Sequence, residues 1–219
     1  MKKVMLLAAV IVAALSINAQ HVVPVSLNLT EYKLDSLRVQ YVNDPVGYLA
    51  QLQQVEIAQK QDADELKSLQ KQLKDEKNFA KERAGLLKDA DKVLKQLEKD
   101  TQSSNKALIS LRNGMEKSHR SIQKQSLVNQ DAKETTTASI SEYKALVEQE
   151  IHASSARLTQ ISKVKSSVAS AHTGLESFNA EVASKEAKIK ELEAKQKANV
   201  AEIKAQIKAA KEAVKAAKK

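Results

Sequence analysis

The stretch VNQDAKETTTASIS, residues 128–141, interrupts a chain that otherwise carries an apolar residue every three or four positions. Residues 123–139 hold almost no large apolar side chain beyond Leu127 and Val128, and they include three consecutive threonines. Apolar residues at a spacing of three and four are typical of helices that bury one face against a neighbour. The lapse therefore separates two helical segments, and we predict a turn of the chain near residues 128–138.

Before the lapse, one core position recurs every seven residues from Pro45 onward. A seven-residue repeat sustained over this length indicates a coiled coil rather than an isolated globular helix. The companion core position is mixed and includes Asp62 and Glu76. The first core position is occupied by Pro45, Leu52, Gln59, Leu66, Leu73, Ala80, Leu87, Leu94, Thr101, Leu108, Met115 and Ile122.

After the lapse a second seven-residue repeat begins at Ile140, out of phase with the first. A four-residue insertion in one continuous helix would explain the phase shift, and so would a chain that turns back. Ser139 and Glu142 have the spacing of a capping box, which favours a new helix at Ser139, and Asp131 with Glu134 offers an earlier start. We therefore predict an all-α fold, a long antiparallel coiled-coil hairpin of two helices of about 80 residues each, occupying residues 45–219.

The N-terminal residues have a different character. Lys2 and Lys3 precede twelve apolar residues and then a small residue at position 19, which predicts a secretory signal peptide at residues 1–19. Residues 20–44 are expected to form an extended or loosely structured leader. Leu37, Val39 and Tyr41 alternate with polar residues, as in a half-exposed strand. Thr30 to Tyr41 fits a short helix capped by Thr30 equally well. Asp44 as a cap and Pro45 in the first turn predict the start of the first long helix.

The composition disfavours an enzyme. The chain has no Cys or Trp and four isolated glycines, and it lacks glycine-flanked serines and clustered metal ligands. We therefore expect no catalytic residue, no cofactor and no metal. The formal net charge of +9 favours acidic partners or anionic membranes, while the signal peptide disfavours nucleic acid as a partner.

Two sets of residues are candidate binding surfaces. The first set widens the apolar face of the two repeats. It would form either a locally thicker core or a docking site for a third helix. Its members are Phe79, Leu86, Val93, Leu175 and Phe178. The second set is a basic stripe near the C-terminus. It would either bind an anionic membrane surface or form a solvated flank of the last helical turns. Its members are Lys204, Lys208, Lys211, Lys215 and Lys218. A two-helix seam needs only a narrow apolar stripe, so we expect self-association.

These features predict an exported bacterial protein of the periplasm, or alternatively of the cell surface or medium, that acts as a structural or protein-interaction module of the envelope. In size, export signal, basic charge and paired long helices the chain also resembles the Skp/OmpH group of periplasmic chaperones. That resemblance implies a holdase for envelope proteins, although the small β-rich body of that group has no counterpart after the second repeat. The hairpins of membrane-fusion adaptors are similar, but they are inserted in β-rich domains that this sequence does not show.

Overall fold

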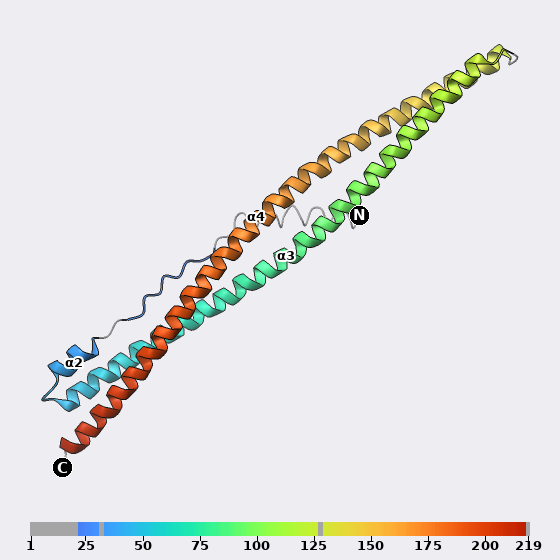
Figure 1. The fold of residues 1–219 in the computed structure, drawn as a ribbon. Coiled ribbons are helices and arrows are strands. Elements are labelled where there is room, and N and C mark those ends of the chain that lie inside the picture. The colour runs from blue at the N-terminus through green and yellow to red at the C-terminus, as the bar shows by residue number, and fades with distance from the viewer. Residues whose placement is uncertain (1–21, 31–32, 127–128, 218–219) are drawn as a thin grey trace. The chain divides into compact units, whose positions relative to one another are not determined.

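The structure, a computed structural model, describes residues 22–30, 33–126 and 129–217. These residues form three helices, α2 (Leu34–Gln40), α3 (Pro45–Lys124) and α4 (Gln130–Ala217), and they contain no β-strand. The two long helices pack against each other (Figure 1). The predicted all-α class is therefore confirmed. The predicted signal peptide, residues 1–19, lies outside the described residues.

Two compact units divide the chain. Of the described residues, unit 1 takes those from Arg83 to Gly174, and unit 2 takes those up to Glu82 together with those from Leu175 onward. Each unit thus holds one part of α3 and one part of α4, and α2 belongs to unit 2.

The predicted seven-residue repeats supply most of the core. Residues spaced in this way present side chains along one stripe of a helix, where a second helix covers them. The buried positions of the repeat in α3 are Leu52, Gln59, Leu66, Leu73, Ala80, Leu87 and Leu94, and those in α4 are Ser154, Val168, Leu175, Val182, Ile189, Ile203 and Ala210. Farther along α3, Leu108, Met115 and Ile122 are only half-buried.

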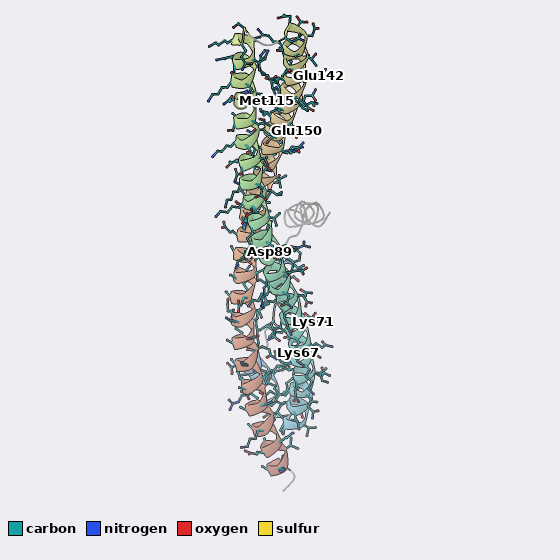
Figure 2. The ribbon with its side chains drawn as sticks, turned by 90° about the vertical axis from the view of Figure 1, so that its right-hand side faces the viewer. Lys67, Lys71, Asp89, Met115, Glu142 and Glu150 are labelled. Carbon is teal, nitrogen blue, oxygen red and sulfur yellow. The ribbon has the colours of Figure 1, made fainter. Side chains whose placement is uncertain are left out.

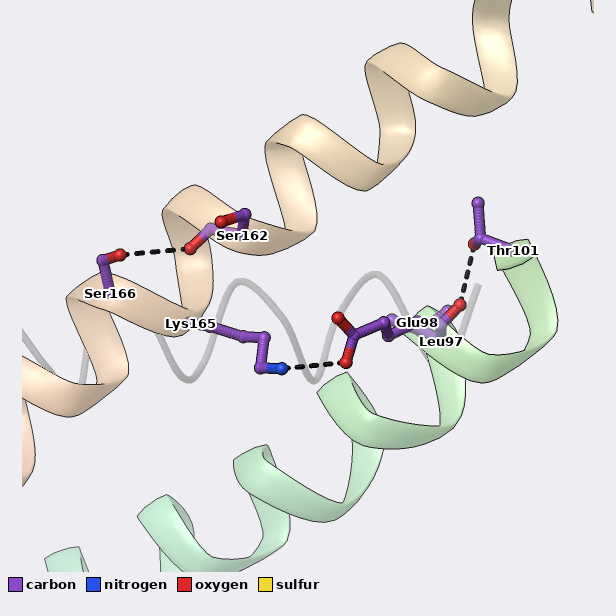
Figure 3. A network of polar contacts seen from close by, with 6 residues as sticks. All are labelled: Leu97, Glu98, Thr101, Ser162, Lys165 and Ser166. Atoms are coloured by element: carbon purple, nitrogen blue, oxygen red, sulfur yellow. Dashed lines mark hydrogen bonds and ion pairs between the residues drawn. The ribbon is translucent and has the colours of Figure 1, made fainter. Parts of the chain in front are cut away.

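In unit 1, α3 and α4 run in opposite directions. Lys165 of α4 donates to Glu98 of α3 at 2.8 Å (Figure 3), and Lys144 lies 3.0 Å from Glu116. Partner numbers fall along α4 as they rise along α3, which is the pattern of antiparallel helices.

The same relationship holds in unit 2. The Tyr48 hydroxyl donates to the side-chain oxygen of Gln206 at 3.0 Å, and the Lys77 ammonium lies 2.8 Å from the Glu186 carboxylate. Short cross-helix contacts of this kind fix which residues of the two helices face each other.

The start of α3 agrees with the sequence. The Asp44 carboxylate accepts a hydrogen bond from the Gly47 amide at 2.9 Å, so it caps the helix, and Pro45 is the first helical residue. A methyl group at Gly47 would overlap the Asp44 carboxylate and lie 3.1 Å from the Tyr41 ring. Glycine at this position is what leaves room for the cap.

A helix, α2, forms instead of the alternative strand at residues 37–41, and Thr30 does not cap it. The helix begins at Leu34 after Lys33, which makes no side-chain cap hydrogen bond, and the Thr30 hydroxyl donates to Asp62 of α3 instead. Leu34 is buried against α3 and α4, with Leu37 and Tyr41 packed beside it. Burial of this apolar side of α2 explains why a helix forms here, since a strand would turn Leu37 and Leu34 to opposite faces.

The predicted turn at residues 128–138 is wrong in its extent, because α4 already begins at Gln130. Asn129 accepts a hydrogen bond from the Asp131 amide at 3.0 Å and starts the helix. Thr136 donates its hydroxyl to the Ala132 carbonyl at 2.7 Å, and Ser139 donates to the Thr135 carbonyl instead of capping a new helix. The stretch without apolar residues is therefore exposed helix, in which hydroxyl groups bond to the carbonyl four residues earlier.

Candidate interaction surfaces

An extended segment, residues 22–30, lies along the helices of unit 2 (Figure 1). From Val25 to Thr30 its residues alternate between half-buried and exposed. This period of two is that of an extended chain with one side against a surface, because successive side chains point in opposite directions. Every residue of the segment keeps some contact with solvent, so it lies on the helices rather than in the core.

Two carboxylates of α3 hold this segment. Thr30 donates to Asp62 with its backbone amide at 3.1 Å and with its hydroxyl at 3.2 Å, and the Val23 amide donates to Glu76 at 3.2 Å. The seven residue steps from Val23 to Thr30 span about 23 Å when extended, and the helix between Asp62 and Glu76 spans about 21 Å. The two carboxylates are therefore spaced to hold an extended chain at both ends.

Beneath the segment, Glu76 also forms an ion pair with Lys185 of α4. The Lys185 ammonium lies 2.8 Å from the Glu76 carboxylate, and the two side chains are 2% and 13% exposed. Asp62 is buried as well. These acidic residues occupy the companion core position, where an apolar residue is expected. Both accept hydrogen bonds from the extended segment, and Glu76 also pairs with α4. The sequence showed the polar breaks in the apolar repeat. It did not show that residues 22–30 donate hydrogen bonds to them.

The extended segment fills its place incompletely. A cavity of about 180 Å³ lies where Val23 and Val25 face Ser184 and Lys188 of α4. A more open cavity of about 490 Å³ is lined by residues 26–28 and by residues of α3 that include Leu69. Both cavities are open to solvent, so the segment lies over the groove without filling it.

Unit 1 carries an apolar surface that no described element covers. Leu111 of α3 is 49% exposed, and Tyr143 and Leu146 of α4 are 61% and 57% exposed. An open cavity of about 730 Å³ is lined in part by Leu111, Met115 and Ile140. Figure 2 shows Met115 on α3 beside the part of α4 that carries Glu142. We call Leu111, Met115, Ile140, Tyr143 and Leu146 the unit 1 apolar face.

The unit 1 apolar face occupies one edge of the contact between the two helices. The Lys144–Glu116 ion pair marks one edge of that contact. At 100° per residue, Tyr143 and Leu146 project from α4 on the side away from Lys144, and Leu111 projects from α3 on the side away from Glu116. Apolar side chains from both helices thus gather opposite the ion pair.

The first predicted binding surface is divided in the structure. Phe178 and Leu175 are buried in the core of unit 2, where the Phe178 ring meets the half-buried Phe79 ring edge-on with centroids 5.5 Å apart. Leu86 is exposed and Val93 half-buried, and both belong to unit 1. The two most buried members, Leu175 and Phe178, form core packing and offer little surface to a partner.

The predicted basic stripe lies on the last turns of α4. Lys204, Lys208, Lys211 and Lys215 are exposed, and Lys218 lies outside the described residues. On the same helix Ile203, Ile207 and Ala210 are buried against α3 and α2. The apolar side of this amphipathic helix is thus covered by the protein itself, and these four lysines face the solvent.

Neither membrane-spanning nor metal-binding features are found in the described part of the chain. No described helix is long and apolar enough to cross a membrane, and no three described His, Cys, Asp or Glu residues are grouped as metal ligands would be. Comparison with protein families, with curated proteins and with solved structures finds no match for this chain.

Proposed function

We propose that this protein is a non-enzymatic coiled-coil hairpin of the bacterial cell envelope that binds other proteins through the unit 1 apolar face. The coiled-coil interpretation is supported by the seven-residue spacing of the buried residues and by the antiparallel contacts within each unit. The periplasmic location is supported by the sequence of residues 1–19 alone.

The observation that carries the binding proposal is the exposure of large apolar side chains on one edge of unit 1. Single exposed apolar residues are ordinary, but several from two adjacent helices, beside an open cavity, mark a protein or membrane interaction site. Leu111, Tyr143 and Leu146 are each about half exposed or more. A partner that offers an apolar helix or strand would remove this surface from water, and a second copy of the chain is one such partner.

Site-specific photo-crosslinking in cells tests this proposal. A photoreactive amino acid at Leu111 or Leu146 is expected to form an adduct with another protein or with a second copy. Ile57 is the matched control, because it is 58% exposed but lies in unit 2. Equal adducts at Leu111 and Ile57, or none at Leu111 and Leu146, would remove the proposal.

A holdase chaperone is the second candidate, favoured by the same exposed apolar side chains together with the net charge of +9. A holdase binds unfolded chains through such surfaces. The purified protein, in modest excess, is then expected to suppress aggregation of an outer-membrane β-barrel protein diluted from urea, and Leu111→Gln with Leu146→Gln is expected to weaken the suppression. Aggregation at the rate seen without the protein would exclude this candidate.

A further inference from the structure

We propose that the groove of unit 2 beneath residues 22–30 is a binding site for an extended segment of another polypeptide, and that residues 22–30 occupy it as a displaceable internal ligand. The site is built from Asp62, Glu76 and Lys185, with the flanking cavities described above. It is separate from the unit 1 apolar face and does not depend on it.

The contacts that hold the extended segment are largely independent of its side chains. Two of its three hydrogen bonds to α3 use backbone amides, those of Val23 and Thr30, and only the third uses a side chain, the Thr30 hydroxyl. Carboxylates only accept hydrogen bonds, so any extended chain offers them suitable donors. Recognition of an extended chain through its backbone, with shallow sites for alternate side chains, is an established mode of peptide binding.

Residues 22–30 are also only partly buried on the helices. No residue from 22 to 30 is buried, whereas Leu34 at the start of α2 is buried against α3 and α4. Residues 22–30 can therefore leave the helices while α2 stays in place. The cavities of about 180 and 490 Å³ along the segment leave space that a ligand with larger side chains would fill.

These features define the chemistry of the ligand. It is extended over at least eight residues, alternates apolar with polar side chains, and carries Ser or Thr about seven residues after the amide that reaches Glu76. An amide at one end and an amide with a hydroxyl at the other match the two acceptors, which are set about 21 Å apart along α3.

The first arm of the test loosens the internal segment without changing the groove. Thr30→Val removes the hydroxyl donor, and Thr30→Ser is its control because it keeps the hydroxyl. Val23→Pro removes the amide donor and keeps the chain extended, and Val23→Ala is its control. The probes are a fluorescent peptide with the sequence of residues 22–30 and a foreign nine-residue peptide with the same alternation, both read by anisotropy.

Binding of both peptides to Thr30→Val and Val23→Pro is expected to be about tenfold tighter than to the intact chain, because the competing segment occupies the groove less. The control variants are expected to bind as the intact chain does. Adding Asp62→Ala to Thr30→Val removes the acceptor and is expected to abolish the gain. Linking Ser26→Cys to Ser68→Cys with a short bismaleimide, in a chain without other cysteines, is expected to block binding.

Two results would overturn the inference. If the loosened variants bind the peptides no more tightly than the intact chain, residues 22–30 are only part of the fold. If they bind the peptide of residues 22–30 but not the foreign one, and form dimers by light scattering, the groove takes a second copy of this chain. In either case crosslinking at Leu111 is unaffected, so failure here is distinct from failure of the proposed function.

Discussion

The Lys185 ammonium lies 2.8 Å from the Glu76 carboxylate at a position where the seven-residue repeat calls for apolar residues. The same carboxylate oxygen accepts the Val23 amide. One buried ion pair therefore joins α3, α4 and the extended segment. Desolvation of the two charges opposes folding, and these contacts offset part of that cost.

Removing one partner of this pair is expected to destabilise the protein strongly. Lys185→Met leaves the Glu76 carboxylate buried without its cation, which costs about 3 kcal/mol of unfolding free energy. The double variant Glu76→Met with Lys185→Met leaves no uncompensated charge and is expected to recover most of that loss. Urea unfolding monitored by circular dichroism measures both.

The exposed pair Lys67–Asp64, 3.1 Å apart, is the control for that experiment. Lys67→Met is expected to change the free energy of unfolding by less than about 1 kcal/mol, since exposed ion pairs contribute little. A Lys185→Met variant as stable as Lys67→Met would show that the Glu76 pair is not buried in solution.

The Phe79–Phe178 contact distinguishes core packing from a docking surface. Phe178→Ala is expected to cost about 3 kcal/mol because the side chain is buried, and its edge-on contact with Phe79 predicts a coupling of about 1 kcal/mol in a double-mutant cycle. Denaturant unfolding of the two single variants and the double variant measures this. A stable Phe178→Ala variant that instead loses self-association would restore the docking interpretation.

Much of the helical architecture could be predicted from local patterns. The repeat that contains Leu52, Leu87 and Leu94 places all three in the core, and Asp44 caps α3 as its position before Pro45 predicts. Both signals depend on residues close together in sequence. The buried face of a helix is visible in the sequence because apolar residues recur every three or four positions, and a short stretch of sequence is enough to show this spacing.

Two features of the structure could not be predicted. One depends on contacts between residues distant in sequence, and the other on a sequence pattern that fits two structures. Asp62 and Glu76 are breaks in an apolar repeat, and nothing near them in sequence says that residues 22–30 bind there. The three threonines at 135–137 lack apolar neighbours, which is equally true of a turn and of a helix exposed on all sides. The structure shows that the helix continues, and the hydroxyls of Thr135 and Thr136 donate to the carbonyls of Asp131 and Ala132 four residues earlier.

The Tyr48 hydroxyl is expected to lose its proton at a higher pH than an ordinary tyrosine. Burial raises the pKa of Tyr48 above its ordinary value of 10.0. A raised pKa means that the protonated hydroxyl favours the fold, so this contribution is present below about pH 10 and is lost as the pH rises through the folded-state pKa. In an ultraviolet titration of the tyrosines, the step that ionises at the highest pH should be absent from Tyr48→Phe. An unchanged titration curve would contradict the buried position of Tyr48.

Acid is expected to weaken the Lys77–Glu186 contact. Hydrogen bonds from Lys77 and then Lys190 hold the pKa of the Glu186 carboxyl below its ordinary value of 4.5. A lowered pKa contributes stability above the unfolded pKa, and that contribution is lost as the pH falls through the folded-state pKa. Carboxyl NMR titration should show the pKa of Glu186 rising in Lys77→Met with Lys190→Met. A pKa unmoved by both changes would show that neither lysine holds the carboxylate.

The position of the turn can be tested with proline. Thr136 lies inside α4, so Thr136→Pro removes a helical hydrogen bond and is expected to cost about 3 kcal/mol locally, seen as lost amide protection at residues 133–135 in hydrogen exchange. Ser126→Pro, between α3 and α4, is the control and is expected to leave that protection unchanged, because Ser126 belongs to neither helix. If Thr136→Pro were tolerated as well as Ser126→Pro, the chain would turn at the threonines, as the lapse in apolar residues first suggested.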